Sequence, residues 1–355
     1  MKIAPRLGWI ALALAGAMLA GCRSREVARL EAPPERPEGE RAVAEELPAT
    51  APLPGERLPR RGDEILVCGQ LFHTGTKVVL WTDPYGYDAY RVDLRFPAET
   101  GKRAEPPQGA RYATLRKHLS AEQKARVEER GWELLELQQE VQQFVMHYDV
   151  CGTSRQCFKV LHDIRGLSVH FLLDVDGTLY QTLDLKERGW HAGEANDRSI
   201  GVEIAHIGAY ESQDAPEFAR FYAHDAQGVR LVFPPSLAKG APAPEQLLRP
   251  ARNGELIAGE IHGRTLYQYD FTDAQYEALA HLVAALRTAL PKIELEAPRD
   301  AAGRVRRDAL SAEELARFSG LLGHFHVTRG KADPGPAFDW ERVLARAREL
   351  SPPQP

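Results

Sequence analysis

The dipeptide Asp176-Gly177 predicts a β-hairpin near the middle of the chain, because it lies between two apolar segments, 169–173 and 178–183. Asp-Gly is favoured in tight turns between antiparallel strands, where Gly adopts a positive φ without steric cost. A hairpin here requires a sheet, and the rest of the chain must supply its other strands and the helices that cover it.

The segments around this hairpin alternate between strand and helix patterns. Residues 144–148 read as a strand that ends in a polar loop, with His147 at the strand end. In the strand 199–205, Ile200, Val202 and Ile204 share one face and Glu203 points to the other. Helices are expected at 154–164, with Ser154 as the cap, at 273–290, opened by Thr272 with Gln275 in the capping-box position, and at the end of the chain. This order predicts an α/β fold with a mixed central β-sheet flanked by helices.

Two segments interrupt this pattern and a third precedes it. Residues 208–269 and 294–319 are rich in Pro, Gly and charge, and we interpret them as insertions that wall a cleft. Residues 63–140 form an N-terminal extension to which the sequence assigns no role, with one helix expected at 121–142. The main domain is expected to span 141–350.

The first 22 residues have the pattern of an export signal, with a basic start, an apolar run too short to span a membrane, and small residues before Cys22. Leu19-Ala20-Gly21-Cys22 resembles the lipobox of bacterial lipoproteins, which implies cleavage before Cys22 and acylation of its thiol. Arg23 follows, where an Asp would suggest retention in the inner membrane. The sequence therefore predicts a lipid-anchored protein of the outer membrane that faces the periplasm.

Residues 23–62 are expected to be a disordered tether, because they are rich in Pro and Glu. The whole chain has a formal net charge of −5 with no basic block, which argues against a nucleic-acid partner.

Export also bears on the remaining cysteines. Cys151 and Cys157 are close enough in sequence to form a disulfide in an oxidising compartment, which would leave Cys68 unpaired, although two buried free thiols are the alternative.

A short segment near the C-terminus carries the chemistry of a zinc hydrolase. Between Gly323 and Trp340 lie His324, His326, Lys331 and Asp333. Imidazole and carboxylate groups are the usual ligands of catalytic zinc, and a Lys can stabilise an oxyanion that forms on a carbonyl. A further ligand must then come from elsewhere in the chain.

Several motifs in order resemble the type 2 N-acetylmuramoyl-L-alanine amidase family, which includes wall-recycling amidases, phage lysozyme-type amidases and animal peptidoglycan recognition proteins. The resemblance covers roughly 141–340, less the insertions. The motifs are Phe-Val-Met-His147-Tyr, Ser168-Val-His170-Phe-Leu, Asp176-Gly177-Thr-Leu-Tyr180-Gln, Trp190-His191-Ala-Gly193, Ser199-Ile-Gly-Val-Glu203, and Gly323-His324 through Lys331-Ala-Asp333-Pro-Gly-Pro.

This resemblance implies a Zn²⁺ ion held by His147, His324 and Asp333, with a fourth position left for water. It further implies that Glu203 is the general base and that Lys331 steadies the tetrahedral oxyanion. His191, Asn196 and Trp190 are expected at the substrate groove, and the Cys151–Cys157 spacing resembles a short disulfide of the animal recognition proteins. The implied activity is hydrolysis of the amide bond between N-acetylmuramic acid and L-alanine in peptidoglycan or muropeptides.

Some alternatives stay open at this point. Asp149 stands where the family more often has Thr, and the His324-to-Asp333 stretch is one residue shorter than in the wall-recycling enzymes. His326 could replace His324 as a ligand, since residues two apart on an extended segment share a face, although the Gly-His order favours His324. A lipoprotein of this fold that binds peptidoglycan without cutting it, and a peptidase that uses the His324–His326 pair, are the competing functions.

Overall fold

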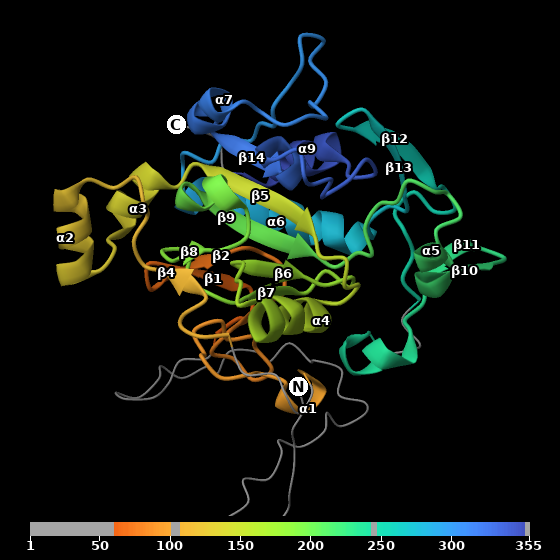
Figure 1. Cartoon of the computed structure of the whole chain (residues 1–355), viewed down its shortest axis with the longest axis horizontal. Coiled ribbons are helices and arrows are strands. Elements are labelled where there is room, and N and C mark those ends of the chain that lie inside the picture. Colours follow the sequence, from red (N-terminus) through yellow and green to blue (C-terminus); the bar gives the residue numbers. More distant parts are fainter. Residues whose placement is uncertain (1–59, 101–106, 243–246, 352–355) are drawn as a thin grey trace, which may run out of the picture. The chain divides into compact units, whose positions relative to one another are not determined.

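The computed structural model describes residues 60–100, 107–242 and 247–351, which belong to one compact unit (Figure 1). The predicted signal peptide, the lipidation site at Cys22 and the predicted tether up to residue 59 lie outside these residues. Within the described ranges, no helix combines the length and the apolar character that crossing a membrane requires.

A six-stranded mixed sheet forms the centre of this unit, which confirms the predicted fold class. Four neighbouring strands, in the order β14, β5, β9 and β6, run parallel to one another. β7 is antiparallel to β6, and β3 pairs in parallel with β7. The strands are β3 (Val78–Leu80), β5 (Gln143–Tyr148), β6 (Phe171–Leu173), β7 (Leu179–Gln181), β9 (Ser199–Ile204) and β14 (Gly320–Gly323).

The hairpin predicted at Asp176-Gly177 joins β6 to β7, as the sequence indicates. Gly177 has a φ of 84°, and its N–H donates to the carbonyl of Asp174 at 3.0 Å. The return bond, from the N–H of Asp174 to the carbonyl of Thr178, closes the turn at 2.9 Å.

The two faces of the sheet are covered by different helices. Phe144, Met146, Ile200 and Val202 pack in the core that also contains the apolar side of α6 (Asp273–Ala289) and α9 (Trp340–Leu350). Side chains alternate along a strand, so His147 and Glu203 point to the other face. That face is covered by α4 (Ser154–Phe158), by the π-helical segment η1 (Lys159–Arg165) and by the 3₁₀ segment η2 (Gly193–Asp197).

Two helix predictions need correction. The cap of α4 is Thr153, whose hydroxyl accepts from the N–H of Gln156, and the predicted helix 154–164 changes to π-helical geometry after Phe158. The helix expected at 121–142 is two helices, α2 (Ala121–Arg130) and α3 (Leu134–Glu140), because Gly131 adopts a φ of 78° and ends the first. The capping box at Thr272 and Gln275 of α6 is present as predicted.

The segment before residue 141 is built into the domain, because it supplies the edge strand β3. It also contributes β4, which pairs antiparallel with β8 next to the central sheet. Besides α2 and α3, it contains a hairpin of β1 (Glu64–Val67) and β2 (Gln70–His73) and the short helix α1 (Pro97–Thr100). β4 is Tyr112–Ala113 and β8 is Arg188–Gly189.

The predicted insertions form small elements outside the central sheet. The first holds two hairpins, which Figure 1 shows on the right of the view, and the second holds a short helix. Their elements are α5 (Pro216–Phe221), β10 (Tyr222–Asp225), β11 (Gly228–Leu231), η3 (Pro235–Gly240), β12 (Ile257–Ile261), β13 (Arg264–Gln268) and α7 (Ala312–Arg317). After β14, the short helix α8 (His324–Val327) leads into the loop that carries Lys331 and Asp333.

Candidate metal centre and active site

Three side chains from distant parts of the chain converge at one edge of the sheet. Nδ1 of His147 lies 2.8 Å from Oδ2 of Asp333, and Nδ1 of His324 lies 3.0 Å from the same oxygen. The two imidazole Nδ1 atoms are 3.0 Å apart. All three residues are buried, and one donor atom from each lies within 4.8 Å of the others. This set matches the predicted ligands.

The backbone explains why these residues meet. β14, β5 and β9 are parallel neighbours, so their carboxyl ends lie at the same edge of the sheet. His147 pairs with Glu203 in the β5–β9 register, and Gly323 pairs with Met146 in the β14–β5 register. His324 therefore follows its strand at the level of His147. Gly323 must lack a side chain here, because a Cβ would lie 2.8 Å from Cδ of Pro334.

The protonation states of these residues suit metal binding. Burial lowers the pKa of His147 to about 4, so its imidazole is neutral and has a free lone pair at neutral pH. Burial alone would raise the pKa of Asp333, but the hydrogen bonds with His147 and His324 outweigh this effect and lower it. The site thus offers a neutral imidazole at His147 and an anionic carboxylate at Asp333, with Nδ1 of His324 beside them.

His326 is not part of this cluster, which answers the question left by the sequence. Its ring is buried, and its Nδ1 accepts from the N–H of Gly323 at 2.9 Å. Its Nε2 lies 2.9 Å from the carbonyl of Arg306, to which it donates. Both ring nitrogens are therefore engaged away from Asp333. The structure favours His324 as the ligand and removes the geometric basis for a His324–His326 pair.

Glu203 lies beside the cluster in the same pocket. Burial raises its pKa well above the usual range, and the negative charges of Asp333 and Asp149 add to this effect, whereas Lys331 opposes it. Among the described residues, its carboxylate has no hydrogen-bond or ion-pair partner. A carboxyl group with a raised pKa in a pocket is the pattern of a general acid–base residue.

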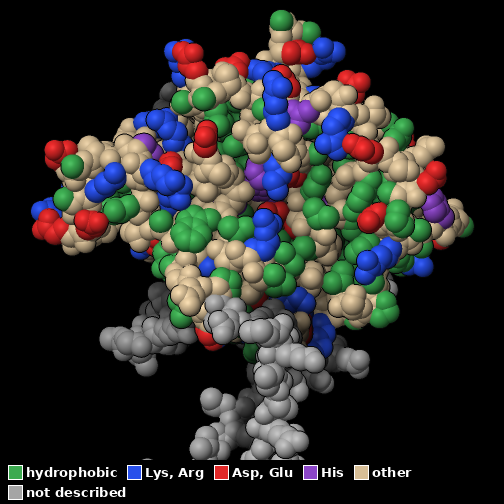
Figure 2. Space-filling view, viewed as in Figure 1, with side chains coloured by type: hydrophobic (Ala, Val, Ile, Leu, Met, Phe, Trp, Pro, Cys, Tyr) green, Lys and Arg blue, Asp and Glu red, His purple; other side chains and the backbone are tan. Residues whose placement is uncertain are grey.

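The pocket around these residues has a volume of about 530 Å³. Figure 2 shows histidine, acidic and basic side chains gathered near the middle of this face. Lys331 is exposed at its rim, and among the described residues its ammonium group has no partner. The lining includes every predicted catalytic, metal and substrate residue, namely His147, Trp190, His191, Asn196, Glu203, His324, Lys331 and Asp333.

The comparison with protein families agrees with this geometry. A family model described as N-acetylmuramoyl-L-alanine amidase matches residues 137–336, which is more than half of the 355-residue chain. The chain belongs to this amidase family. The match includes all three members of the candidate metal centre as well as Glu203 and Lys331.

Solved structures similar to this amidase chain are distant in sequence. A selenomethionine derivative of AmpD is 19% identical, with a TM-score of 0.29, over 59% of this chain and 86% of that one. AmiD from E. coli, in complex with anhydro-N-acetylmuramic acid-L-Ala-D-γ-Glu-L-Lys, is 17% identical, with a TM-score of 0.32, over 58% of this chain and 57% of that one. LysC of Clostridium intestinale is also 17% identical, with a TM-score of 0.32, over 60% of this chain and 88% of that one. No curated protein is similar enough to this chain to count as a match.

His191 packs against His147 of the candidate metal centre in this amidase. Its Nδ1 lies 3.1 Å from Nε2 of His147, and it therefore fixes the ring whose Nδ1 faces Asp333. A Cβ at Gly201 would lie 2.5 Å from the His191 ring, so β9 needs Gly at that position. Nε2 of His191 is buried without a partner.

The other two predicted groove residues, Asn196 and Trp190, have different roles, and His170 lies close to His191. Oδ1 of Asn196 accepts from the N–H groups of His191 at 3.2 Å and Ala192 at 2.7 Å, so Asn196 orders the loop that carries His191. His170 is fully buried beneath His191, with its Nε2 3.0 Å from the carbonyl of Glu187. Trp190 is half-buried and lines the pocket, so it stays the best candidate for direct substrate contact.

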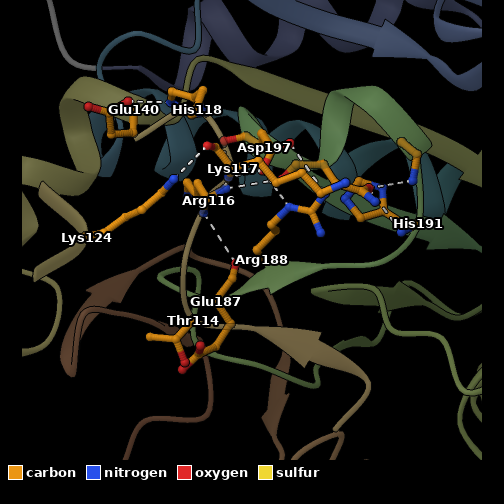
Figure 3. A network of polar contacts seen from close by, with 12 residues as sticks. Thr114, Arg116, Lys117, His118, Lys124, Glu140, Glu187, Arg188, His191 and Asp197 are labelled. Carbon is orange, nitrogen blue, oxygen red and sulfur yellow. Dashed lines mark hydrogen bonds and ion pairs between the residues drawn. The ribbon is translucent and has the colours of Figure 1, made fainter. Parts of the chain in front are cut away.

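Arg116 in the N-terminal extension anchors the same loop, a role that the sequence did not indicate. Its fully buried guanidinium donates to the carbonyls of Asn196 and Asp197 through Nη1, and to those of Leu185 and Glu187 through Nη2. Asp197 in turn accepts from Nε of Arg188 at 2.6 Å. Figure 3 shows that this network extends from the extension to His191. The extension therefore positions His191, which contacts His147 of the candidate metal centre.

Asp149, Cys151 and Cys157 line the same pocket. One carboxylate oxygen of Asp149 accepts from the N–H groups of Cys151, Gly152 and His206, and burial raises its pKa to about 7. The predicted Cys151–Cys157 disulfide is not formed in this structure, where both residues are free thiols, as is Cys68. The two thiols interact with each other, so their pairing in an oxidising compartment stays a prediction.

Gln268, from the first insertion, clamps the turn that follows Asp333. Its fully buried side-chain amide donates to the carbonyl of Pro334 at 3.0 Å and accepts from the N–H of Ala337 at 3.0 Å. Gly335 lies between them with a φ of 90°, and a Cβ there would lie 2.1 Å from Oε1 of Gln268. The insertion thus holds in place the turn that follows Asp333.

We expect Gln268→Leu to weaken binding of a divalent ion by about 10–100-fold, the usual effect of losing a residue that orients a ligand. The leucine can make neither hydrogen bond, so the turn after Asp333 becomes free to shift. Zinc affinity measured by competition with a chromogenic chelator checks this. Gln138→Leu is the control, because Gln138 donates to the carbonyl of Ala289 at 2.9 Å and lines no part of the pocket. Equal zinc affinity in the two variants would contradict the assignment.

Proposed function

We propose that this protein hydrolyses the amide bond between N-acetylmuramic acid and L-alanine in peptidoglycan or muropeptides, in a zinc-dependent reaction. The observation that carries the proposal is the convergence of His147, His324 and Asp333 in one pocket with Glu203. Family membership supports the amidase chemistry. The complete ligand set argues for catalysis over binding alone.

The donor atoms present fit zinc. Catalytic zinc sites commonly use three protein ligands drawn from His, Asp and Glu, and leave a further position open. Here two Nδ1 atoms and one carboxylate oxygen meet at the wall of an open pocket. When bound, zinc supplies Lewis-acid chemistry, which activates water and polarises a carbonyl.

The remaining steps belong to the side chains of the chain. The carboxylate of Glu203 takes a proton from the attacking water as the new C–O bond forms at the lactyl carbonyl. The same carboxyl group then delivers the proton to the nitrogen of L-alanine as the C–N bond breaks. The Lys331 ammonium, which has no partner among the described residues, offsets the negative charge that develops on the carbonyl oxygen.

Removal of zinc tests this proposal. Protein treated with a chelator should stop releasing stem peptides from wall fragments and should recover when zinc is restored. The mass of the sugar product identifies the bond, because an amidase leaves no L-alanine on the sugar and a peptidase does. Full activity without metal, or saturable wall binding with no product at all, would refute the proposal.

We further propose that the mature protein is anchored by lipid at Cys22 and faces the periplasm from the outer membrane. The proposal comes from the sequence pattern of residues 1–22, followed by the Pro-rich segment 23–62. At ~3 Å per residue, an extended tether of this length reaches roughly 100 Å, which suits a substrate in the wall. Cys22→Ser should shift the protein from the membrane fraction to the soluble fraction, and an unchanged membrane fraction would refute the anchor.

A further inference from the structure

A second cleft lies outside the amidase pocket and shares none of its lining residues. It has a volume of about 1060 Å³ and is bounded by Arg252 and by three segments: strand β12 of the first insertion, residues 299–308 of the second, and the chain from Pro336 to Glu341 that leads into α9. Figure 1 shows the β12–β13 hairpin and α9 in the upper part of the view. The insertions therefore create a space of small-molecule size, in addition to holding the turn that follows Asp333.

Most charges that line this cleft are neutralised by neighbours. Three arginines each bond a carboxylate on the cleft wall, and Asp339 accepts from the N–H of Arg342 as the cap of α9. Arg252 is bound to Asp270 at 2.7 Å and also donates to the carbonyl of Ala337, so its guanidinium is held in place. The three wall pairs are Arg299–Glu341 at 2.7 Å, Arg304–Asp300 at 2.9 Å and Arg306–Asp308 at 3.0 Å.

Arg307 is the exception among the arginines. The carboxylate of Glu260 also lines the cleft without a partner among the described residues, but Glu260 is exposed to solvent. The side chain of Arg307 is more than half buried, and among the described residues its guanidinium makes no hydrogen bond or ion pair. Its Nη1 is buried without a partner. Burial lowers the pKa of Arg307, and the charged neighbour that adds to this effect is another cation, Arg252. A partly buried cation that faces a second cation is costly unless an anion joins them.

Trp340, another residue of the cleft lining, carries a second unpaired donor. Trp340 is 3% exposed, and its Nε1 is buried without a hydrogen-bond partner. An indole N–H can only donate, as can a guanidinium. The unmet hydrogen-bonding capacity at Arg307 and Trp340 is therefore all of donor type, which suits a ligand that supplies acceptor oxygens.

We infer that this cleft binds a small molecule through an oxyanion, a carboxylate or a phosphate, held by Arg307 and Arg252. A guanidinium presents parallel N–H groups that match both oxyanions, and Arg252 is already oriented by Asp270 and Ala337. One ligand that carries such a group is a wall peptide with its carboxylates, and this choice rests on the proposed amidase function. The other is inorganic phosphate, which is independent of that function.

Thermal unfolding at constant ionic strength, with and without inorganic phosphate, tests the inference. We expect phosphate to raise the Tm of the wild type and to leave Arg307→Met unchanged. Without phosphate, Arg307→Met should have a Tm equal to or above that of the wild type, because it removes an unpaired buried charge. A purely structural arginine would behave in the opposite way, and a lower Tm with an unchanged phosphate response would overturn the inference.

Arg304→Met is the matched control, since it removes the same charge from the same cleft but from an exposed pair with Asp300. It should keep the response to phosphate.

The measurement is repeated after chelation, and a response that vanishes with the metal would assign the phosphate to the amidase centre and overturn the inference. Calorimetric titration with a stem-type tripeptide should show binding to the wild type at least tenfold tighter than to Arg307→Met if wall peptides are the source. If phosphate binds and the tripeptide does not, the cleft is an oxyanion site for phosphate. If neither probe binds, the inference is refuted.

Discussion

Glu203→Gln is expected to lower turnover by about 10²–10⁴-fold while zinc remains bound, because the amide can no longer accept the proton of the attacking water. Gln has almost the same size as Glu, and Glu203 is not one of the three residues that meet at the candidate metal centre. Release of stem peptide and zinc content should be measured on the same samples. Glu194→Gln is the control, since Glu194 is an exposed residue of η2 that does not line the pocket.

The pH profile adds a second readout for the same residue. Burial, together with the charges of Asp333 and Asp149, raises the pKa of Glu203. A general base acts in its ionised form, so wild-type activity should fall as the pH decreases through this raised pKa. The residual activity of Glu203→Gln should lack that acidic limb. A variant that retains wild-type turnover, or the same acidic limb, would show that Glu203 is not the base.

His324→Ala is expected to abolish activity together with zinc binding, whereas His326→Gln should retain both. His324 offers its Nδ1 to the cluster, 3.0 Å from Asp333, whereas His326 uses both nitrogens for Gly323 and Arg306. Loss of a direct ligand should cost more zinc affinity than the ~10–100-fold typical of a supporting residue.

The variant that keeps zinc binding, His326→Gln, should be the less stable of the two. His326→Gln disturbs two buried hydrogen bonds, so we expect it to lose about 1–3 kcal/mol of unfolding free energy. His324→Ala should affect the zinc-free protein less. Zinc titration and chemical denaturation of both variants provide the comparison. Zinc lost in His326→Gln but kept in His324→Ala would exchange the roles of the two histidines.

The parts of the fold and site that were predictable depend on local patterns. Strand β9 alternates apolar residues with Glu203, and the segment before His147 is continuously apolar, so both strands and the residues at their ends could be identified. Asp176-Gly177 and the Thr272 cap are likewise local signals. The choice between His324 and His326 needed the structure. In an extended strand, residues two apart point to the same face, but both histidines lie in the helix α8, where they point in different directions.

The supporting residues were not predictable, because their partners are distant in sequence. Gln268 bonds residues 66 and 69 positions away, and Arg116 reaches carbonyls 69–81 positions away. Nothing in the local sequence distinguishes these two from ordinary surface residues. The division of the predicted helix 121–142 was signalled by Gly131, but the helical spacing on both sides concealed it.

Diffraction at the zinc absorption edge from crystals of the zinc-loaded protein tests the account most directly. One anomalous peak should lie within coordination distance, ~2.0–2.2 Å, of Nδ1 of His147, Nδ1 of His324 and a carboxylate oxygen of Asp333. Glu203 should lie beside the ion without binding it. A peak at His326, or zinc bound without His147, would contradict the account.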